Sequence, residues 1–193
     1  MIEKTRILGI AGSLRKDSYN RAVLRAAAEL VSDNVQIDIF ELDGIPSFNQ
    51  DDEQSPPNKV TELKQRIRES DAILFVTPEY NYSVPGVLKN AIDWAYKPFN
   101  KKAVAYVSYG SVGGARAVEH LRNVMVELQA ASVRHGIHIG GSEFASVFMG
   151  QRSWDEVKTS FDAFVPDLLN NLAWWTNATK VAREVELEEA VAA

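Results

Sequence analysis

Short apolar runs and stretches with helical periodicity alternate along the whole chain. Residues 6–11 are continuously apolar after Arg6, which is typical of a parallel strand buried on both faces. Residues 19–31 follow with apolar side chains on one stripe of a helix. The same alternation predicts strands at 35–40, 72–76, 103–107 and 132–139, and helices at 59–69, from 87 to near Pro98, and at 117–128 and 154–179.

Five strands separated by helices predict an α/β fold with an open, doubly wound parallel sheet and right-handed crossovers. The 193 residues contain no internal boundary, so we expect one domain over residues 1–180 and an acidic tail over residues 181–193. Pro166 is expected to kink the last helix. The tail has little to bury, so we expect it to be frayed or docked on a partner.

Composition narrows the classes of function. The chain has no cysteine, which excludes disulfides, a thiolate nucleophile and metal centres held by cysteine. A formal net charge of −5 argues against nucleic-acid binding. No apolar run approaches the roughly 18 residues of a membrane span, and the first residues lack the pattern of a targeting signal. We therefore expect a soluble, cytoplasmic protein that binds no membrane.

In a doubly wound sheet, ligands bind beyond the carboxyl ends of the strands. The loop over residues 12–21 leaves the first strand there, with Ser13, Ser18 and Asn20 as short polar side chains and Arg15 as a guanidinium suited to phosphate. The start of the next helix adds unpaired N–H groups. The loop has neither a Walker nor a GxGxxG pattern. It fits a cup for a terminal phosphate, and it also fits an ordinary helix capped by a serine.

Two further loops at the same edge are unusual. Residues 77–86 place two tyrosines, an asparagine and a glutamate directly after an apolar strand, which favours a wall for a flat ring but also fits a helix entry capped by Ser83. Residues 108–115 contain three glycines and two serines, so their backbone can approach a ligand closely; the alternative is a plain glycine-rich turn. Three such loops at one edge together favour a binding site.

The motifs in these loops resemble those of the NADPH-dependent FMN reductase family, which includes bacterial flavin, quinone, chromate and azo-dye reductases. They are Gly-Ser-Leu-Arg-x-x-Ser-x-Asn at 12–20, Pro-Glu-Tyr-Asn-Tyr-Ser-x-Pro-Gly at 78–86 followed by Leu-Lys-Asn-Ala-Ile-Asp-Trp at 88–94, and Gly-Gly at 113–114. The resemblance implies a flavodoxin-like fold with strand order 2-1-3-4-5, noncovalently bound FMN, and assembly into homodimers or homotetramers.

The resemblance also implies which residues hold the cofactor. The FMN phosphate would be held by Ser13, Arg15, Ser18 and Asn20. The isoalloxazine ring and ribityl chain would be bordered by Pro78, Glu79, Tyr80, Asn81 and Tyr82. The polar edge of the ring would be closed by Ser108, Gly110 and Gly113. No side chain is implied as a catalytic acid or base, because the flavin carries the chemistry, and no metal is expected.

The implied activity is an FMN-dependent oxidation of NADH or NADPH. The electrons would pass to a small acceptor, such as a quinone, free flavin, chromate or an azo compound. Since no second nucleotide fingerprint is visible, one shared pocket with ping-pong turnover is expected. No clamp for a 2′-phosphate is readable, so the choice between NADH and NADPH stays open.

Three alternatives differ in class. A flavodoxin-type electron carrier would bind FMN without oxidising NAD(P)H, and such carriers are usually much more acidic than this chain. A receiver-type regulatory module would need an aspartate where Thr77 ends the third strand. The helical C-terminal region could also serve as a protein-interaction surface. The histidines are not expected to be catalytic, and His135 and His138 are expected to lie away from the three loops.

Overall fold

The computed structural model describes residues 4–16 and 18–192. Its centre is a parallel five-stranded sheet with the strand order β2-β1-β3-β4-β5. The predicted fold class and strand order are therefore confirmed. The strands are β1 (Thr5–Ala11), β2 (Val35–Glu41), β3 (Ala72–Pro78), β4 (Ala103–Tyr109) and β5 (Ala131–Ile139).

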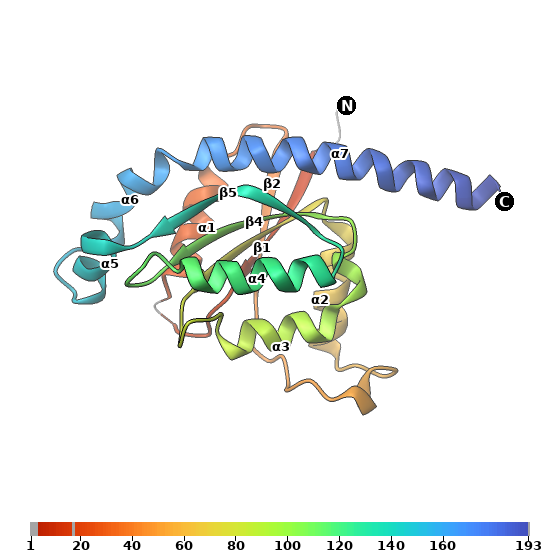
Figure 1. Cartoon of the computed structure of the whole chain (residues 1–193), viewed down its shortest axis with the longest axis horizontal. Helices are drawn as coiled ribbons and strands as arrows, with labels where there is room; N and C mark the ends of the chain where they lie inside the picture. The colour runs from red at the N-terminus through yellow and green to blue at the C-terminus, as the bar shows by residue number, and fades with distance from the viewer. Residues whose placement is uncertain (1–3, 17, 193) are drawn as a thin grey trace.

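Helices cover both faces of this sheet (Figure 1). One face carries α1 (Tyr19–Glu29), α6 (Trp154–Asp162) and α7 (Val165–Ala192), and the other carries α2 (Asn58–Glu69), α3 (Gly86–Ala95) and α4 (Ala115–Glu127). Each face has its own hydrophobic core. The short helix α5 (Gly141–Phe148) follows β5, and the 3-10 turns η1 (Gln50–Asp52) and η2 (Lys97–Phe99) lie in connections.

The strand register brings the three loops of interest together. Every residue of β3 and β4 is buried, as their continuous apolar runs predict for strands inside a parallel sheet. Ala11 at the end of β1 pairs with Val76 of β3, and Thr77 of β3 pairs with Ser108 of β4. The loops that leave β1, β3 and β4 therefore start side by side at one edge.

The C-terminal third differs from the predicted single, kinked helix. The structure has two helices, α6 and α7, and Pro166 lies in the first turn of α7, where its missing N–H group breaks no helical hydrogen bond. The tail is helical to Ala192 rather than frayed, and the division predicted at residue 180 falls inside this helix. Two contacts help to hold it: Arg183 donates to the carbonyl of Lys101, and Lys101 pairs with Glu186. None of the described helices is long and apolar enough to cross a membrane.

Candidate functional site

A buried asparagine organises the loop between β1 and α1. The amide orientation that satisfies all neighbours of Asn20 has its nitrogen donating to the Val76 carbonyl at 2.9 Å and to the Tyr109 hydroxyl at 3.2 Å. Its oxygen then accepts from the Ser13 N–H at 3.0 Å and from the Ser18 hydroxyl at 2.9 Å. Ser18 also caps α1 by accepting the N–H of Asn20. Asn20 thus lies beneath the loop and joins the ends of β1, β3 and β4.

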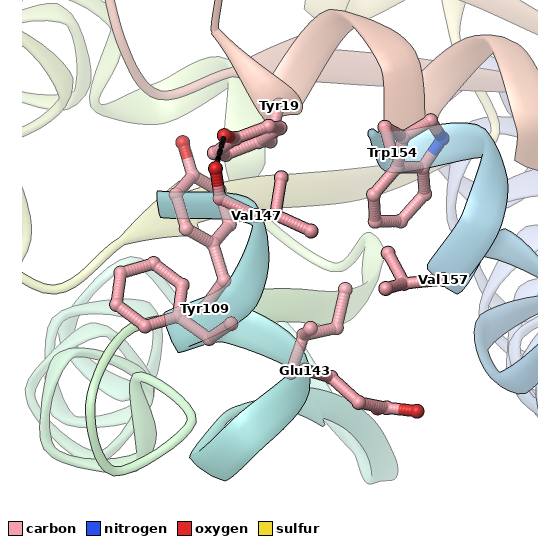
Figure 2. A pocket seen from close by; sticks show the side chains of 8 residues that line it. Tyr19, Tyr109, Glu143, Val147, Trp154 and Val157 are labelled. Atoms are coloured by element: carbon pink, nitrogen blue, oxygen red, sulfur yellow. Dashed lines mark hydrogen bonds between the residues drawn. The ribbon is translucent and has the colours of Figure 1, made fainter. Parts of the chain in front are cut away.

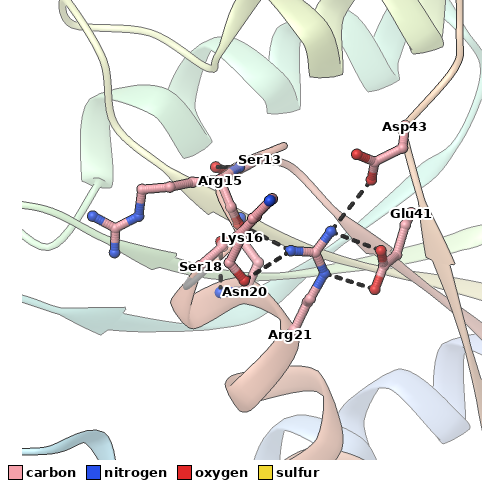
Figure 3. A network of polar contacts seen from close by, with 8 residues as sticks. All are labelled: Ser13, Arg15, Lys16, Ser18, Asn20, Arg21, Glu41 and Asp43. Atoms are coloured by element: carbon pink, nitrogen blue, oxygen red, sulfur yellow. Dashed lines mark hydrogen bonds and ion pairs between the residues drawn. The ribbon is translucent and has the colours of Figure 1, made fainter.

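Arg21 braces the same loop from the side of β2 (Figure 3). Its guanidinium donates to both carboxylate oxygens of Glu41, at 2.6 and 2.7 Å, and to Asp43 at 3.3 Å. It also donates to the carbonyls of Arg15 at 2.9 Å and Lys16 at 3.1 Å. The hydrogen bond from Arg21 lowers the pKa of Glu41 and, in turn, raises the pKa of Arg21. The local sequence does not mark Arg21 as a brace, because its partner Glu41 lies 20 residues further along the chain.

Arg15 lies on the outer side of this loop. Its side chain is exposed, whereas Ser13 and Ser18 are buried. The Ser13 hydroxyl accepts the backbone N–H of Arg15 at 3.3 Å, and the Arg15 guanidinium carbon lies 5.4 Å from the centre of the Tyr19 ring. Figure 3 shows the Arg15 side chain extending away from Arg21. The loop therefore offers one guanidinium outward while its serines are turned into the protein.

The loop after β3 forms a tight hairpin that exposes two aromatic rings. Tyr80 and Ser83 exchange two backbone hydrogen bonds, of 2.9 and 3.0 Å. Between them, Asn81 and Tyr82 have φ angles of +50° and +68°, as in a type I′ turn. This conformation is common for asparagine but strained for a bulky tyrosine. Tyr80 is 52% exposed and Tyr82 is 66% exposed, so the strained turn holds both rings in an open position.

Arg116 of α4 clamps this hairpin. Its Nε donates to the buried carboxylate of Glu79 at 2.5 Å, and its backbone N–H donates to the same carboxylate at 3.2 Å. The Arg116 guanidinium carbon also lies 3.7 Å from the centre of the Tyr82 ring, a cation–π contact. The hydrogen bond to Glu79 raises the pKa of Arg116. His120 of α4 adds a 3.0 Å hydrogen bond to Ser83. Glu79 therefore contributes an internal anchor, and no motif in the sequence indicates Arg116, which holds it from 37 residues away.

The glycine-rich loop after β4 folds back onto the end of β5. Ser108 has no exposed surface, and its hydroxyl donates to the Gly113 carbonyl at 2.7 Å. Its oxygen also lies 2.8 Å from Nδ1 of His138. Gly110 donates to the Ile139 carbonyl at 3.2 Å. The expectation that His138 lies away from the loops is wrong, because a bulge in β5 shifts the register of this strand.

Backbone N–H groups at the turn of this loop are available as hydrogen-bond donors. Within the described part of the chain, no acceptor is found for the backbone N–H groups of Ser111, Val112 and Gly114. Gly114 stands at the N-terminus of α4, where the helix dipole favours negative charge. The loop therefore offers a short row of backbone donors beside the exposed tyrosines.

Aromatic packing closes the site toward α5 and α6 (Figure 2). The Tyr19 hydroxyl donates to the Val147 carbonyl at 3.0 Å, and the Tyr19 ring meets the Tyr109 ring edge-on. Burial raises the pKa of Tyr109 to about 12, so its hydroxyl stays protonated at neutral pH. The pocket beside these rings has a volume of about 10 Å³, room for roughly one water molecule. These residues form a packed wall rather than a ligand cavity.

Comparison with known proteins identifies the family of this site. The family model for NADPH-dependent FMN reductases matches residues 5–143, which include all three loops. The chain belongs to this family. The resemblance is thereby confirmed, and with it the enzyme class and the pairing of FMN with NAD(P)H.

Individual relatives agree with this assignment. The chain is 46% identical over 135 residues to an NAD(P)H-dependent FMN reductase of Pseudomonas aeruginosa, which covers 66% of this chain and 73% of the relative. It is 40% identical over 166 residues to a quinone reductase of Pseudomonas putida, covering 81% and 88%. The solved flavoenzyme NAD(P)H:(acceptor) oxidoreductase of Paracoccus denitrificans superposes with a TM-score of 0.73 at 28% identity, covering 91% of this chain and 98% of that one.

The structure brings the predicted site residues to one edge of the sheet, but in different roles. The outward-facing group contains Arg15 and the hairpin tyrosines, while Asn20, Ser108 and the Glu79 carboxylate are internal. The residues gathered at this edge are Ser13, Arg15, Ser18, Asn20, Pro78, Glu79, Tyr80, Asn81, Tyr82, Ser108, Gly110 and Gly113.

Proposed function

We propose that this chain is an FMN-dependent NAD(P)H oxidoreductase that passes electrons to a small acceptor, with a quinone as the first candidate. The observation that carries the proposal is the convergence of the three loops at the carboxyl ends of β1, β3 and β4. One loop offers a guanidinium, one offers exposed aromatic rings and one offers backbone donors. These are the groups that a phosphate, a flat heterocycle and its polar edge require.

The first loop fits the phosphate end of FMN. Arg15 is exposed and supplies a planar fork of N–H donors. The start of α1 adds the positive end of a helix dipole. Ser13, Ser18 and Asn20 would hold the loop in the phosphate-binding conformation, since Asn20 already bonds to both serines. We therefore assign direct contact first to Arg15 and the backbone, and support to Asn20.

The second and third loops fit the ring. A Cβ atom on Gly114 would lie 2.7 Å from Cβ of Ser108, and Gly114 has a φ angle of +74°, so only glycine lets the loop lie this close to the end of β4. The N–H groups of this loop would donate to the polar edge of the isoalloxazine and favour negative charge on it. Tyr80, Asn81 and Tyr82, with Pro78 at the base of their loop, would border the ring and the ribityl chain.

When bound, FMN supplies hydride acceptance and electron transfer. The chain's own residues would bind and orient it, with the exposed hairpin tyrosines beside the ring. We assign no side chain as acid or base, because solvent can exchange the protons at an edge this open. NAD(P)H and the acceptor would use the same face in turn, which is ping-pong turnover. The relatives named quinone reductases support a quinone acceptor; free flavin, chromate and azo compounds are the further acceptors to screen.

Two other properties stay predictions. We propose a homodimer or homotetramer, on the strength of family resemblance. A cytoplasmic location likewise rests on the sequence pattern alone.

The decisive experiment measures FMN binding and turnover on one preparation. We expect the purified protein to bind FMN and to oxidise NADPH or NADH in the presence of a quinone, with parallel lines in a two-substrate kinetic analysis. Arg15→Ala should weaken FMN binding by about 1.5–3 kcal/mol, or roughly ten- to a hundredfold, for one lost charged hydrogen bond. Lys16→Ala, which removes the neighbouring exposed cation of the same loop, serves as the matched control and should bind FMN nearly as the wild type does.

Three different results would each contradict a different part of the proposal. Failure to bind FMN under any reconstitution would remove the cofactor assignment. FMN binding without NAD(P)H oxidation would instead favour the electron-carrier alternative. Equal FMN affinity in Arg15→Ala and the wild type would refute the role of the guanidinium while leaving the enzyme class intact.

A further inference from the structure

His138 lies at the end of a directed chain of hydrogen bonds. The Ser108 hydroxyl has one proton, and it donates that proton to the Gly113 carbonyl at 2.7 Å. The 2.8 Å contact between the Ser108 oxygen and Nδ1 of His138 must then be a donation from the imidazole. Burial lowers the pKa of His138, so at neutral pH the ring has a single N–H, which this contact places on Nδ1.

A bulge in β5 brings His138 to Ser108. Val104 of β4 pairs with Ser132, but Tyr106 pairs with Gly136. The register therefore advances two residues on β4 and four on β5. Without these two extra residues Ser108 would pair with Gly136 rather than His138, and a residue without a side chain would stand opposite its hydroxyl.

The bulge is held by an arginine of α4. Arg122 donates to the carbonyls of Val133 at 2.8 Å and Arg134 at 3.0 Å, and its guanidinium lies 4.7 Å from the centre of the Tyr106 ring. An arginine on a neighbouring helix thus satisfies the carbonyls that the bulge removes from the ladder. The hydrogen bonds from Arg122 therefore stabilise the strand register that places His138 opposite Ser108.

The glycine-rich loop lies close against the Cβ and backbone of His138, although the residue as a whole is exposed. A Cβ atom on Gly113 would lie 3.0 Å from Cβ of His138, and one on Gly140 would lie 2.6 Å from the Gly113 nitrogen. A peptide unit is planar and trans, so its carbonyl and its N–H point in opposite directions. With the Gly113 carbonyl held by Ser108, the N–H of Gly114 points away from Ser108.

We propose that His138 is a positioning residue for the flavin site: through Ser108 it fixes the Gly113–Gly114 peptide, and so aims the Gly114 N–H at the cofactor. This inference rests on the proposed function, because it assumes that FMN lies against the glycine-rich loop. His138 itself does not touch the cofactor. Its effect on the reaction passes through one hydroxyl and one peptide unit.

A pair of substitutions separates this role from simple packing. In His138→Asn the amide nitrogen stands as many bonds from the backbone as Nδ1 does, so it can donate to Ser108. His138→Leu has a similar shape but no donor. We expect the FMN dissociation constant to rise about tenfold in His138→Leu, the loss of roughly one hydrogen bond, and to return to within about twofold of wild type in His138→Asn. The midpoint potential of bound FMN should fall in His138→Leu and recover in His138→Asn.

Two further variants keep the test decisive. Ser108→Ala should match His138→Leu, and the double variant should be no weaker than either single one, because both break the same chain. If His138→Leu does not fold, His138→Gln, whose amide stands one bond too far out, replaces it as the donor-displaced variant.

The outcomes separate this inference from the proposed function. Wild-type affinity in His138→Leu, no recovery in His138→Asn, or additive effects with Ser108→Ala would each overturn the positioning role while FMN binding stands. A wild-type protein that binds no FMN would overturn both.

Discussion

Removing the amide of Asn20 should destabilise the protein more than any other single polar truncation at the site. Asn20 has no exposed surface and joins the Ser13 N–H, the Val76 carbonyl and two hydroxyls. In Asn20→Ala the Ser13 N–H loses its partner, whereas the Val76 carbonyl keeps the N–H of Gly12 at 2.8 Å. One unsatisfied buried group costs about 1–3 kcal/mol. Hydroxyls can turn to new partners, so they add little. We expect a loss of about 1–3 kcal/mol, a substantial share of the roughly 5–15 kcal/mol that stabilises a typical domain.

Two variants test the reasoning behind this number. Asn20→Asp keeps the shape but cannot donate to the Val76 carbonyl, and it buries a charge, so it should be at least as unstable as Asn20→Ala at pH 7. Asn123→Ala is the matched control, because Asn123 is exposed on α4, and it should stay within about 0.5 kcal/mol of the wild type.

Urea unfolding of the protein without added FMN, followed by circular dichroism, measures these differences. The same variants are then titrated with FMN. Asn20→Ala should bind FMN more weakly as well, because the phosphate loop loses its support from β3 and β4. A loss of stability below about 1 kcal/mol in Asn20→Ala would refute the view that its amide is a hub of four hydrogen bonds.

Three further predictions address other parts of the molecule. Gly114→Ala should cost about 1–3 kcal/mol in urea unfolding, because its Cβ would meet β4 and its φ angle is +74°, whereas Gly86→Ala, with open space around it, should be nearly neutral. Burial lowers the pKa of Lys102 from 10.5 to about 8, so the unfolded chain binds more protons between these values. Stability should then rise by about 1–2 kcal/mol from pH 8 to pH 9.5, and a flat profile, or the same rise in Lys102→Met, would contradict this. Glu186→Gln should shift thermal unfolding by less than about 1 kcal/mol, because its ion pair is exposed; a larger loss would show that the tail helix depends on this pair.

Much of the fold follows from local pattern. Continuous apolar runs predict β3 and β4 because a strand buried on both faces of a parallel sheet has no need of polar alternation. The tyrosine-rich and glycine-rich loops stand out for a related reason: each follows such a strand directly. The division between α6 and α7 was missed because their apolar positions stay nearly in phase across residues 163–164.

The contacts that hold the site residues in place could not be predicted from the sequence. The clamp between Arg116 and Glu79 joins residues 37 positions apart, and neither motif nor periodicity pairs them. The sequence predicts His138 in a strand-like segment away from the loops, and the register that begins at Val104 and Ser132 would put Gly136 opposite Ser108 if it ran regularly. The actual position of His138 depends on a bulge that Arg122 holds from another helix.

The sequence by itself determined the class of fold, the edge of the sheet that carries the site and the family to which the chain belongs, because these depend on residue types and their spacing along the chain. The tertiary structure decided which of the motif residues face outward and which are internal supports. Arg15 and Asn20 belong to one motif, yet the first is exposed and the second is buried among four hydrogen-bond partners. The physical reason is that exposure and hydrogen bonding depend on strand register and on groups brought from distant elements, and local sequence does not encode these pairings one by one.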